Sequence, residues 1–238
     1  MVAAHAQKRG GYRSPRKLHT LSSQQGYRLP PLRFSLGVNT AYYNGDITSK
    51  FSDNSYRIGG DIGVMQPISP RVTLGVEFTY FQLKAKDSQP DRGLRFTSDN
   101  FMLVPFLRYN FIADRSMYLG VGQRAQPLQV YFEVGVGAIR YDPKSYLAAN
   151  GPTPLIPESK GGYPATAAVA PVGLGISYRV SKGVYLGLEG LYYFSSTDLL
   201  DDVSQRGNSK NLDQFAVANF KFEFTLPTKK GKPLVHFD

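Results

Sequence analysis

Apolar and polar residues alternate with a period of two along most of the chain. In the stretch "RFSLGVNTAYY" (33–43), Phe34, Leu36 and Val38 fall on one face, and Ser35 and Gly37 fall on the other. Strict alternation is typical of a β-strand with two different faces. The pattern returns seven more times and therefore predicts eight strands, whose apolar faces lie in residues 34–42, 58–64, 72–80, 103–111, 130–138, 170–178, 184–194 and 216–224.

The two faces of these predicted strands differ in charge. The apolar face carries no charged residue, whereas the opposite face is rich in Gly, Ser and Thr and carries eight charges: Asp61, Glu77, Arg108, Glu133, Arg179, Glu189, Lys221 and Glu223. A soluble lipocalin-like barrel would turn the apolar face inward, and a membrane barrel would turn it toward lipid. The wide apolar face, the glycine-rich polar face and strands of about 9–11 residues favour the membrane barrel. The inward charges would then pair into a network within the lumen.

The links between the predicted strands alternate in length. The links "ISPR" (68–71) and "VSKG" (180–183) are tight turns, whereas those at 44–55, 86–95, 142–165 and 195–211 are long and polar. Outer-membrane barrels have short turns on the periplasmic side and long loops outside. The link at 112–127 departs from this rule. Pro105 and Pro171 lie within strands, where a missing N–H predicts an edge, a bulge or a register error.

The predicted fold is all-β: an eight-stranded antiparallel transmembrane β-barrel of the outer-membrane type, spanning residues 31–226. Eight strands enclose a lumen that side chains fill, and an even strand count puts both termini in the periplasm. Residues 1–30 would form a basic N-terminal tail and residues 227–238 a C-terminal tail. Ala4-His5-Ala6 before Gln7 fits a secretory cleavage site, so we interpret residues 1–6 as the remnant of a signal peptide.

The net charge of +10 is concentrated in the tails. Basic tails bind acidic proteins, anionic lipid surfaces or nucleic acids. No folded nucleic-acid-binding motif accompanies the basic residues, so we expect no nucleic acid partner. We expect instead that the tail docks a protein partner through its cluster of bases, Lys8, Arg9, Arg13, Arg16 and Lys17.

The residue types argue against catalysis. The chain has no cysteine, and its three histidines, His5, His19 and His236, lie in the tails. This leaves no Ser-His-Asp site and no His-based metal site in the barrel. Glu133 and Glu189 could form a carboxylate pair, but ion pairing with Arg108 or Arg179 is the favoured role of such inward charges. We expect no enzyme activity, no metal and no cofactor.

The stretch "SSTDLLDDVS" (195–204) places Asp198, Asp201 and Asp202 within five positions. Three interpretations are a metal site, an acid–base pair and a local cap. The spacing lacks the regular ligand pattern and glycine turn of a calcium loop. We favour a short helical turn capped by Thr197 or Asp198, with Asp201 and Asp202 near its start or exposed to solvent.

Four segments carry a family resemblance: "AYYNGDI" (41–47), "FEVGVGAIRYDPK" (132–144), "PVGLGISYRVSKGVYLGLE" (171–189) and "LGLEGLYYFSSTDLLDDVS" (186–204). In these segments the chain resembles the Bacteroidota outer-membrane barrel family that includes PorG, a component of the type IX secretion system. The Asp-Asp loop with Asp198, Asp201 and Asp202 is the most specific part of the match, which spans most of residues 34–224. The basic tail has no counterpart in the family pattern.

The resemblance implies a barrel without catalytic residues that anchors periplasmic ring lipoproteins or translocon subunits of the secretion and gliding machinery. The alternative is a small transport or ligand-binding barrel, with its ligand in the long extracellular loops, or an accessory subunit of another outer-membrane complex. On either interpretation we expect a position in the outer membrane, in contact with its lipid.

Overall fold

The computed structural model describes residues 29–226, except 46, 49, 88–92, 118–125, 148–150, 152, 158, 160 and 204–211. The predicted tails, including Lys8, Arg9, Arg13, Arg16 and Lys17, lie outside the described residues. The strands are β1 (Arg33–Asn44), β2 (Ile58–Pro67), β3 (Val72–Lys86), β4 (Leu94–Asn110), β5 (Leu128–Gly135), β6 (Gly137–Leu147), β7 (Ala165–Ser181), β8 (Val184–Ser195) and β9 (Gln214–Thr225). Two single-turn 3₁₀ helices, η1 (Phe51–Asp53) and η2 (Arg115–Met117), lie in the links. No helix in this part of the chain is long and apolar enough to cross a membrane.

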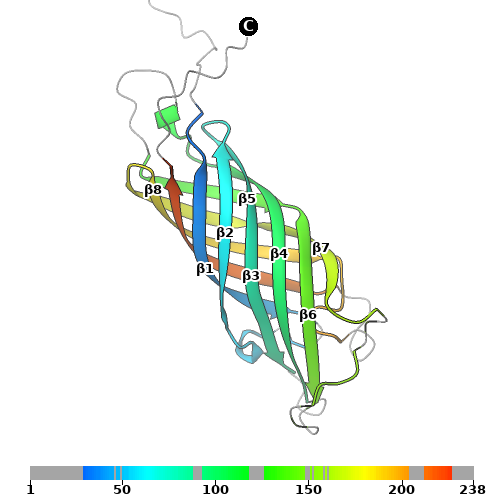
Figure 1. Cartoon of the computed structure of the whole chain (residues 1–238). Coiled ribbons are helices and arrows are strands. Elements are labelled where there is room, and N and C mark those ends of the chain that lie inside the picture. Colours follow the sequence, from blue (N-terminus) through cyan, green and yellow to red (C-terminus); the bar gives the residue numbers. More distant parts are fainter. Residues whose placement is uncertain are drawn as a thin grey trace, which may run out of the picture.

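The strands form one closed antiparallel ring, the predicted eight-stranded transmembrane barrel (Figure 1). β1 pairs with both β2 and β9, which closes the barrel between the first and last strands. β5 and β6 together take the place of one strand in the barrel wall, because both pair with β4 on one side and with β7 on the other. The ring therefore has eight positions, as the periodicity predicts.

The division between β5 and β6 has a cause in a neighbouring strand. The N–H of Val136 donates to the carbonyl oxygen of Pro105 at 3.3 Å, but Pro105 has no N–H to return the bond. The register is unchanged across the gap, since Phe106 pairs with Gly135 and Leu103 with Ala138. The predicted irregularity at Pro105 is thus one missing ladder bond, and the strand is not shifted.

The connections divide the barrel into two ends. The terminal end carries the first and last described residues and the tight turns between β2 and β3 and between β7 and β8 (Figure 1). The loop end carries the long links that follow β1, β3, β6 and β8. The link after β4 is a long one at the terminal end, as the sequence indicates.

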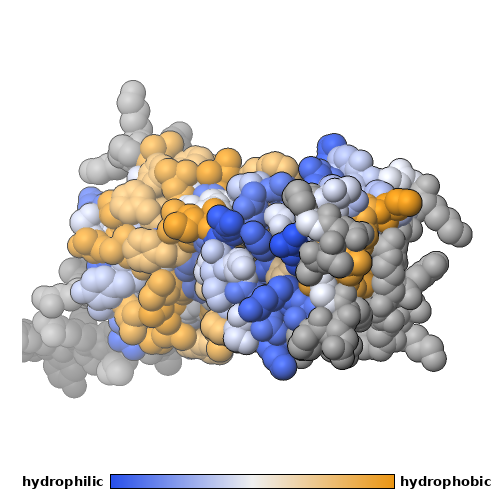
Figure 2. Space-filling view, turned by 90° about the horizontal axis from the view of Figure 1, so that it is seen from below, coloured by the Kyte–Doolittle hydropathy of each residue, from blue (hydrophilic) through white to orange (hydrophobic). Residues whose placement is uncertain are grey.

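The eight predicted apolar faces point outward. Leu36, Leu74, Leu103 and Phe220 are among the large hydrophobic side chains exposed on the barrel wall. Figure 2 shows a broad hydrophobic area on one face, beside a hydrophilic band. We call this outward surface the apolar belt. In a transmembrane barrel it is the surface that meets lipid.

Three walls extend beyond the apolar belt, so the predicted strand lengths are too short there. β3 has 15 residues, β4 has 17 and β7 has 17. Past Tyr80 the outward positions of β3 become polar, and the inward Phe81, Leu83 and Ala85 are buried. The apolar face has switched sides because the outside of the barrel meets water here and the inside becomes its core.

Candidate functional site

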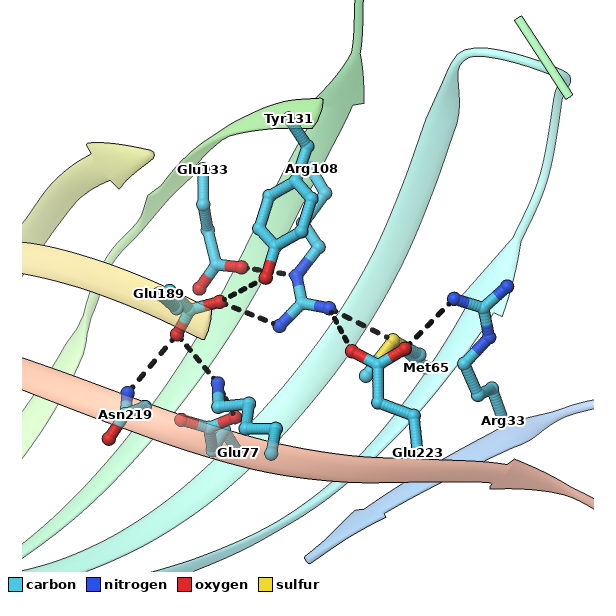
Figure 3. Close-up of polar contacts among 10 residues, drawn as sticks. Arg33, Met65, Glu77, Arg108, Tyr131, Glu133, Glu189, Asn219 and Glu223 are labelled. Atoms are coloured by element: carbon cyan, nitrogen blue, oxygen red, sulfur yellow. Dashed lines mark hydrogen bonds and ion pairs between the residues drawn. The ribbon is translucent and has the colours of Figure 1, made fainter. Parts of the chain in front are cut away.

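The lumen contains a buried charge network centred on Arg108 of β4 (Figure 3). Its guanidinium forms ion pairs with three carboxylates. Nη2 lies 2.9 Å from Glu189 of β8, Nη1 lies 2.9 Å from Glu223 of β9, and Nε contacts Glu133 of β5. Nη1 also lies 3.4 Å from the sulfur of Met65. The planar guanidinium has donors on three sides, so a single arginine can join several walls.

Lys221 of β9 is the second centre of the network. Its Nζ lies 2.6 Å from Glu77 of β3 and 2.6 Å from Glu189, and its side chain is 0% exposed. Glu189 also accepts hydrogen bonds from Tyr131 at 2.9 Å and Asn219 at 3.1 Å. Glu189 therefore links the two bases and ties β3, β4, β8 and β9 together across the lumen.

Arg33 extends the network to β1. The sequence places this residue at the start of the first predicted strand, but it was not among the eight predicted lumen charges. Its Nη1 pairs with Glu223 at 2.9 Å, and its guanidinium lies 3.9 Å above the ring of Tyr185. Its inward direction could have been read from the alternation, because Arg33 is two residues before Ser35 and four before Gly37, whose side of the strand faces the lumen.

Two of the eight predicted lumen charges lie outside the network. Arg179 sits near the terminal end, where Nε donates to the backbone oxygen of Ser181 at 3.3 Å. It is partly exposed because β7 leaves the sealed part of the lumen there. Asp61 is only 3% exposed but makes no hydrogen bond among the described residues. Its carboxylate lies 2.4 Å from the position that a Cβ on Gly37 would take, so any larger residue at position 37 would have to push the Asp61 carboxylate aside.

Toward the loop end the lumen is apolar, which the prediction of a polar lumen did not include. Phe215 of β9 stacks on Tyr193 of β8, with ring centroids 4.8 Å apart, and on Phe81 of β3 at 5.1 Å. All three rings are almost fully buried, together with Phe96 and Leu191. We call this set, with the neighbouring buried residues Ile47, Leu200 and Val203, the apolar plug.

The Asp-Asp loop closes the barrel above the apolar plug. The Tyr43 hydroxyl lies 2.5 Å from Asp201 and 2.7 Å from Asp213. Asp202 accepts hydrogen bonds from Ser145 at 2.8 Å and Tyr163 at 2.7 Å. Burial and the bond to Asp202 raise the pKa of the Tyr163 hydroxyl above its ordinary value, so it is protonated and donates at neutral pH.

The prediction of a helical turn with exposed aspartates is wrong in this loop. Residues 196–203 contain no helix, and Asp201 and Asp202 are buried. Asp202 has a φ of 61°, which turns the chain back so that Leu200 and Val203 enter the plug. Thr197 makes a local turn, since its Oγ1 accepts from the N–H of Leu199 at 3.2 Å, and the same oxygen lies 3.1 Å from the hydroxyl of Tyr141 on β6. Asp198 is half-buried.

The carboxylates of the described residues are arranged for ion pairing and not for catalysis. Glu133 and Glu189 each pair with Arg108, as favoured from the sequence, and not with each other. No group of three or more His, Cys, Asp or Glu side chains in the described ranges is placed to hold a metal ion. Buried carboxylates that already accept charged hydrogen bonds are poorly placed to activate water.

Comparison with solved structures gives the same architecture. Neisserial surface protein A (NspA) matches with a TM-score of 0.51 and 13% sequence identity, over 83% of this chain and 99% of that one. The fold is that of an eight-stranded outer-membrane barrel. The outer membrane protein OprG from Pseudomonas aeruginosa matches at a TM-score of 0.42, with 11% identity over 85% of this chain and 99% of that one. The outer membrane enzyme PagL matches at 0.36, with 13% identity over 82% of this chain and 99% of that one.

No protein-family model matches the sequence, and a search of curated proteins finds no significant relative. The match to NspA shows the fold alone, because a sequence identity of 13% is too low to carry a function over. The features that bear on function are those of this chain's own lumen and surface.

Proposed function

We propose that this protein is a non-enzymatic outer-membrane barrel that anchors or assembles protein partners on the periplasmic side. The observation that carries the proposal is the closed lumen. Among the residues that the structure describes, a charge network and an apolar plug follow one another along the barrel axis and fill the lumen, so these residues leave no solute path and no substrate pocket along that axis. The function then lies at the two ends and on the outer wall.

The terminal end is the better candidate for the docking surface. Both termini leave the barrel there, and the chain ends carry most of the positive charge. In the proposed orientation this end faces the periplasm, as it does in barrels with short periplasmic turns. An acidic protein, or a protein held against anionic lipid headgroups, is the kind of partner that a basic tail fits.

The family resemblance narrows this proposal to a role like that of PorG in type IX protein secretion. Its partners would then be periplasmic ring lipoproteins or subunits of the translocon. The closed lumen disfavours the alternative of a small transport barrel, because eight strands leave room only for the side chains that already fill them.

A pull-down from outer membranes in mild detergent, with the full chain tagged and the captured proteins identified by mass spectrometry, tests this proposal. We expect periplasmic lipoproteins or secretion subunits to co-purify with the native chain. A variant with Lys8, Arg9, Arg13, Arg16 and Lys17 replaced by glutamine should lose them and still fold as a barrel. In the matched control, glutamine replaces Lys229, Lys230 and Lys232 of the C-terminal tail instead.

Recovery of the barrel alone would contradict the assembly role. Recovery of the same partners with the five-base variant would contradict docking through the basic tail and leave the assembly role standing.

A further inference from the structure

A cluster of bases covers the outer wall immediately beyond the apolar belt at the loop end. Five cationic side chains project outward from three adjacent strands: Lys84 and Lys86 on β3, Arg95 on β4, and Arg140 and Lys144 on β6. We call this set the basic wall. The surface lies outside the barrel, so it belongs neither to the lumen network nor to the proposed docking tail.

The register brings like charges together on this wall. Lys86 pairs directly with Arg95, and Thr97 lies between Lys84 and Lys144 on the two flanking strands. Like charges directly opposite on one face of a sheet destabilise it unless something neutralises them. Among the described residues, no ion pair neutralises Lys84, Lys86 or Lys144. Arg95 donates to the backbone oxygen of Gly151 at 2.8 Å, which leaves its charge uncompensated.

The acids on the same wall occupy a different row. Asp99 and Asp142 face each other between the apolar belt and the lysines. Asp99 already accepts hydrogen bonds from Tyr80 at 3.0 Å and Gln82 at 2.6 Å. The bases outnumber these acids, and at the outward positions of the described strands the two rows farther from the belt, Lys84–Thr97–Lys144 and Lys86–Arg95–Tyr146, contain no acid. The wall as a whole thus presents a positive surface.

The position of the wall matches the depth of lipid headgroups. Lys84 is four residues past Tyr80, the last aromatic residue of the belt on β3. On a strand tilted by about 45° and rising about 3.4 Å per residue, this places Lys84 roughly 10 Å beyond the belt. Headgroups begin at the edge of the hydrocarbon, and a lysine side chain can bend several ångströms back toward them.

A hollow of about 420 Å³ crosses the same boundary. Phe78 and Phe101 line it on the belt side, and Arg140 and Asp142 line it on the polar side. One part of the hollow is therefore apolar, and the other carries Arg140 beside the carboxylates of Asp99 and Asp142. The hollow fits the apolar chain of an amphiphile, and the cations that meet its anionic group are those of the lysine rows.

We propose that the basic wall binds the phosphate groups of a membrane lipid in the leaflet at the loop end. In the outer-membrane orientation proposed above, on which this choice of lipid rests, the lipid is a phosphorylated glycolipid of the lipid A type. Several cations spread over three strands suit a headgroup with two phosphates better than a single free anion. Binding would fix the height and rotation of the barrel in the membrane.

The test uses the purified full chain in phosphatidylcholine nanodiscs that contain either lipid A or dephosphorylated lipid A, with bound lipid counted by native mass spectrometry. We expect retention of lipid A and little retention of the dephosphorylated form. The variant Lys84→Gln/Lys86→Gln/Lys144→Gln should bind lipid A roughly a hundred-fold more weakly, because each cation near an anionic surface contributes about five-fold. The control variant Arg71→Gln/Arg179→Gln/Lys182→Gln, at the terminal end, should bind as the native chain does.

Three results would overturn the proposal. The native chain and the lysine variant could retain lipid A equally, or the native chain could retain the two lipids equally. Inorganic phosphate could also displace lipid A when the two are present at similar concentrations. The last result would identify a site for free phosphate. Because the purified barrel is used without partners, the outcome is independent of the pull-down that tests the assembly role.

Discussion

Replacing Arg108 with methionine is expected to lower the free energy of unfolding of the barrel by on the order of 3–5 kcal/mol. The substitution keeps the volume of the side chain approximately but leaves Glu133, Glu189 and Glu223 without their shared base. Three carboxylates would then face one another in a buried lumen. Glu189 would keep its pair with Lys221 and Glu223 its pair with Arg33, but Glu133 would lose the base that pairs with it, so the penalty is that of an unpaired buried charge.

The measurement is reversible urea unfolding of the native and variant chains in lipid vesicles, followed by tyrosine fluorescence and gel mobility. Arg179→Met is the matched control, since Arg179 also points inward but lies outside the network and is partly exposed. It should change the unfolding free energy by less than about 0.5 kcal/mol. An Arg108→Met barrel as stable as the native one would show that the network contributes nothing to holding the walls together.

Replacing Phe215 with alanine is the second change with a large expected effect, about 3–5 kcal/mol of destabilisation. Phe215 lies between Tyr193 and Phe81 in the apolar plug, and its removal leaves a cavity that rigid strands cannot close. Phe220→Ala on the same strand is the control, because Phe220 faces outward and its loss creates no internal cavity. Phe220→Ala should lower the free energy of unfolding by about 1–2 kcal/mol, because only the favourable burial of the ring in lipid is lost.

The same urea titration compares the two phenylalanine variants. A larger loss for Phe220→Ala than for Phe215→Ala would contradict the interpretation that the loop half of the barrel has an interior hydrophobic core.

The strands of the barrel could be predicted from sequence because a lipid-facing wall requires an uninterrupted apolar face. The residues at which the strands end were harder to predict. At Tyr80 and Phe81 the apolar phase passes from the outward to the inward face, and a search for one continuous face stops at that point. The phase switch is itself a readable signal: it marks where a barrel wall leaves the membrane and begins to enclose a core.

The lumen network was predictable in kind but not in detail. Parity alone identifies inward charges, so Glu77, Glu133, Glu189, Lys221 and Glu223 follow directly from the pattern. Pairing depends on height along the barrel axis and on strand stagger, which no single strand reveals. Arg179 has the correct parity but lies too close to the terminal end to join the network. Arg33 was overlooked because it stands at the very start of the first strand, where the alternation has only begun.

The Asp-Asp loop shows a different limit. Its aspartates are buried because tyrosines from β1 and the link after β6, Tyr43 and Tyr163, bring hydroxyl donors to them. Those donors are far away in sequence, at separations of 158 and 39 residues. Local composition favours an exposed cap, and only the closed ring brings the loop over the plug.

Single-channel recording in planar bilayers tests the closed lumen most directly. With the charge network and the apolar plug in series, the native full chain should insert and show no stable conductance. Arg108→Met and Phe215→Ala should each remain closed to steady current, because each leaves the other barrier intact. A stable open level in the native protein would contradict the closed lumen, and with it the inference that the function lies at the ends and outer wall of the barrel.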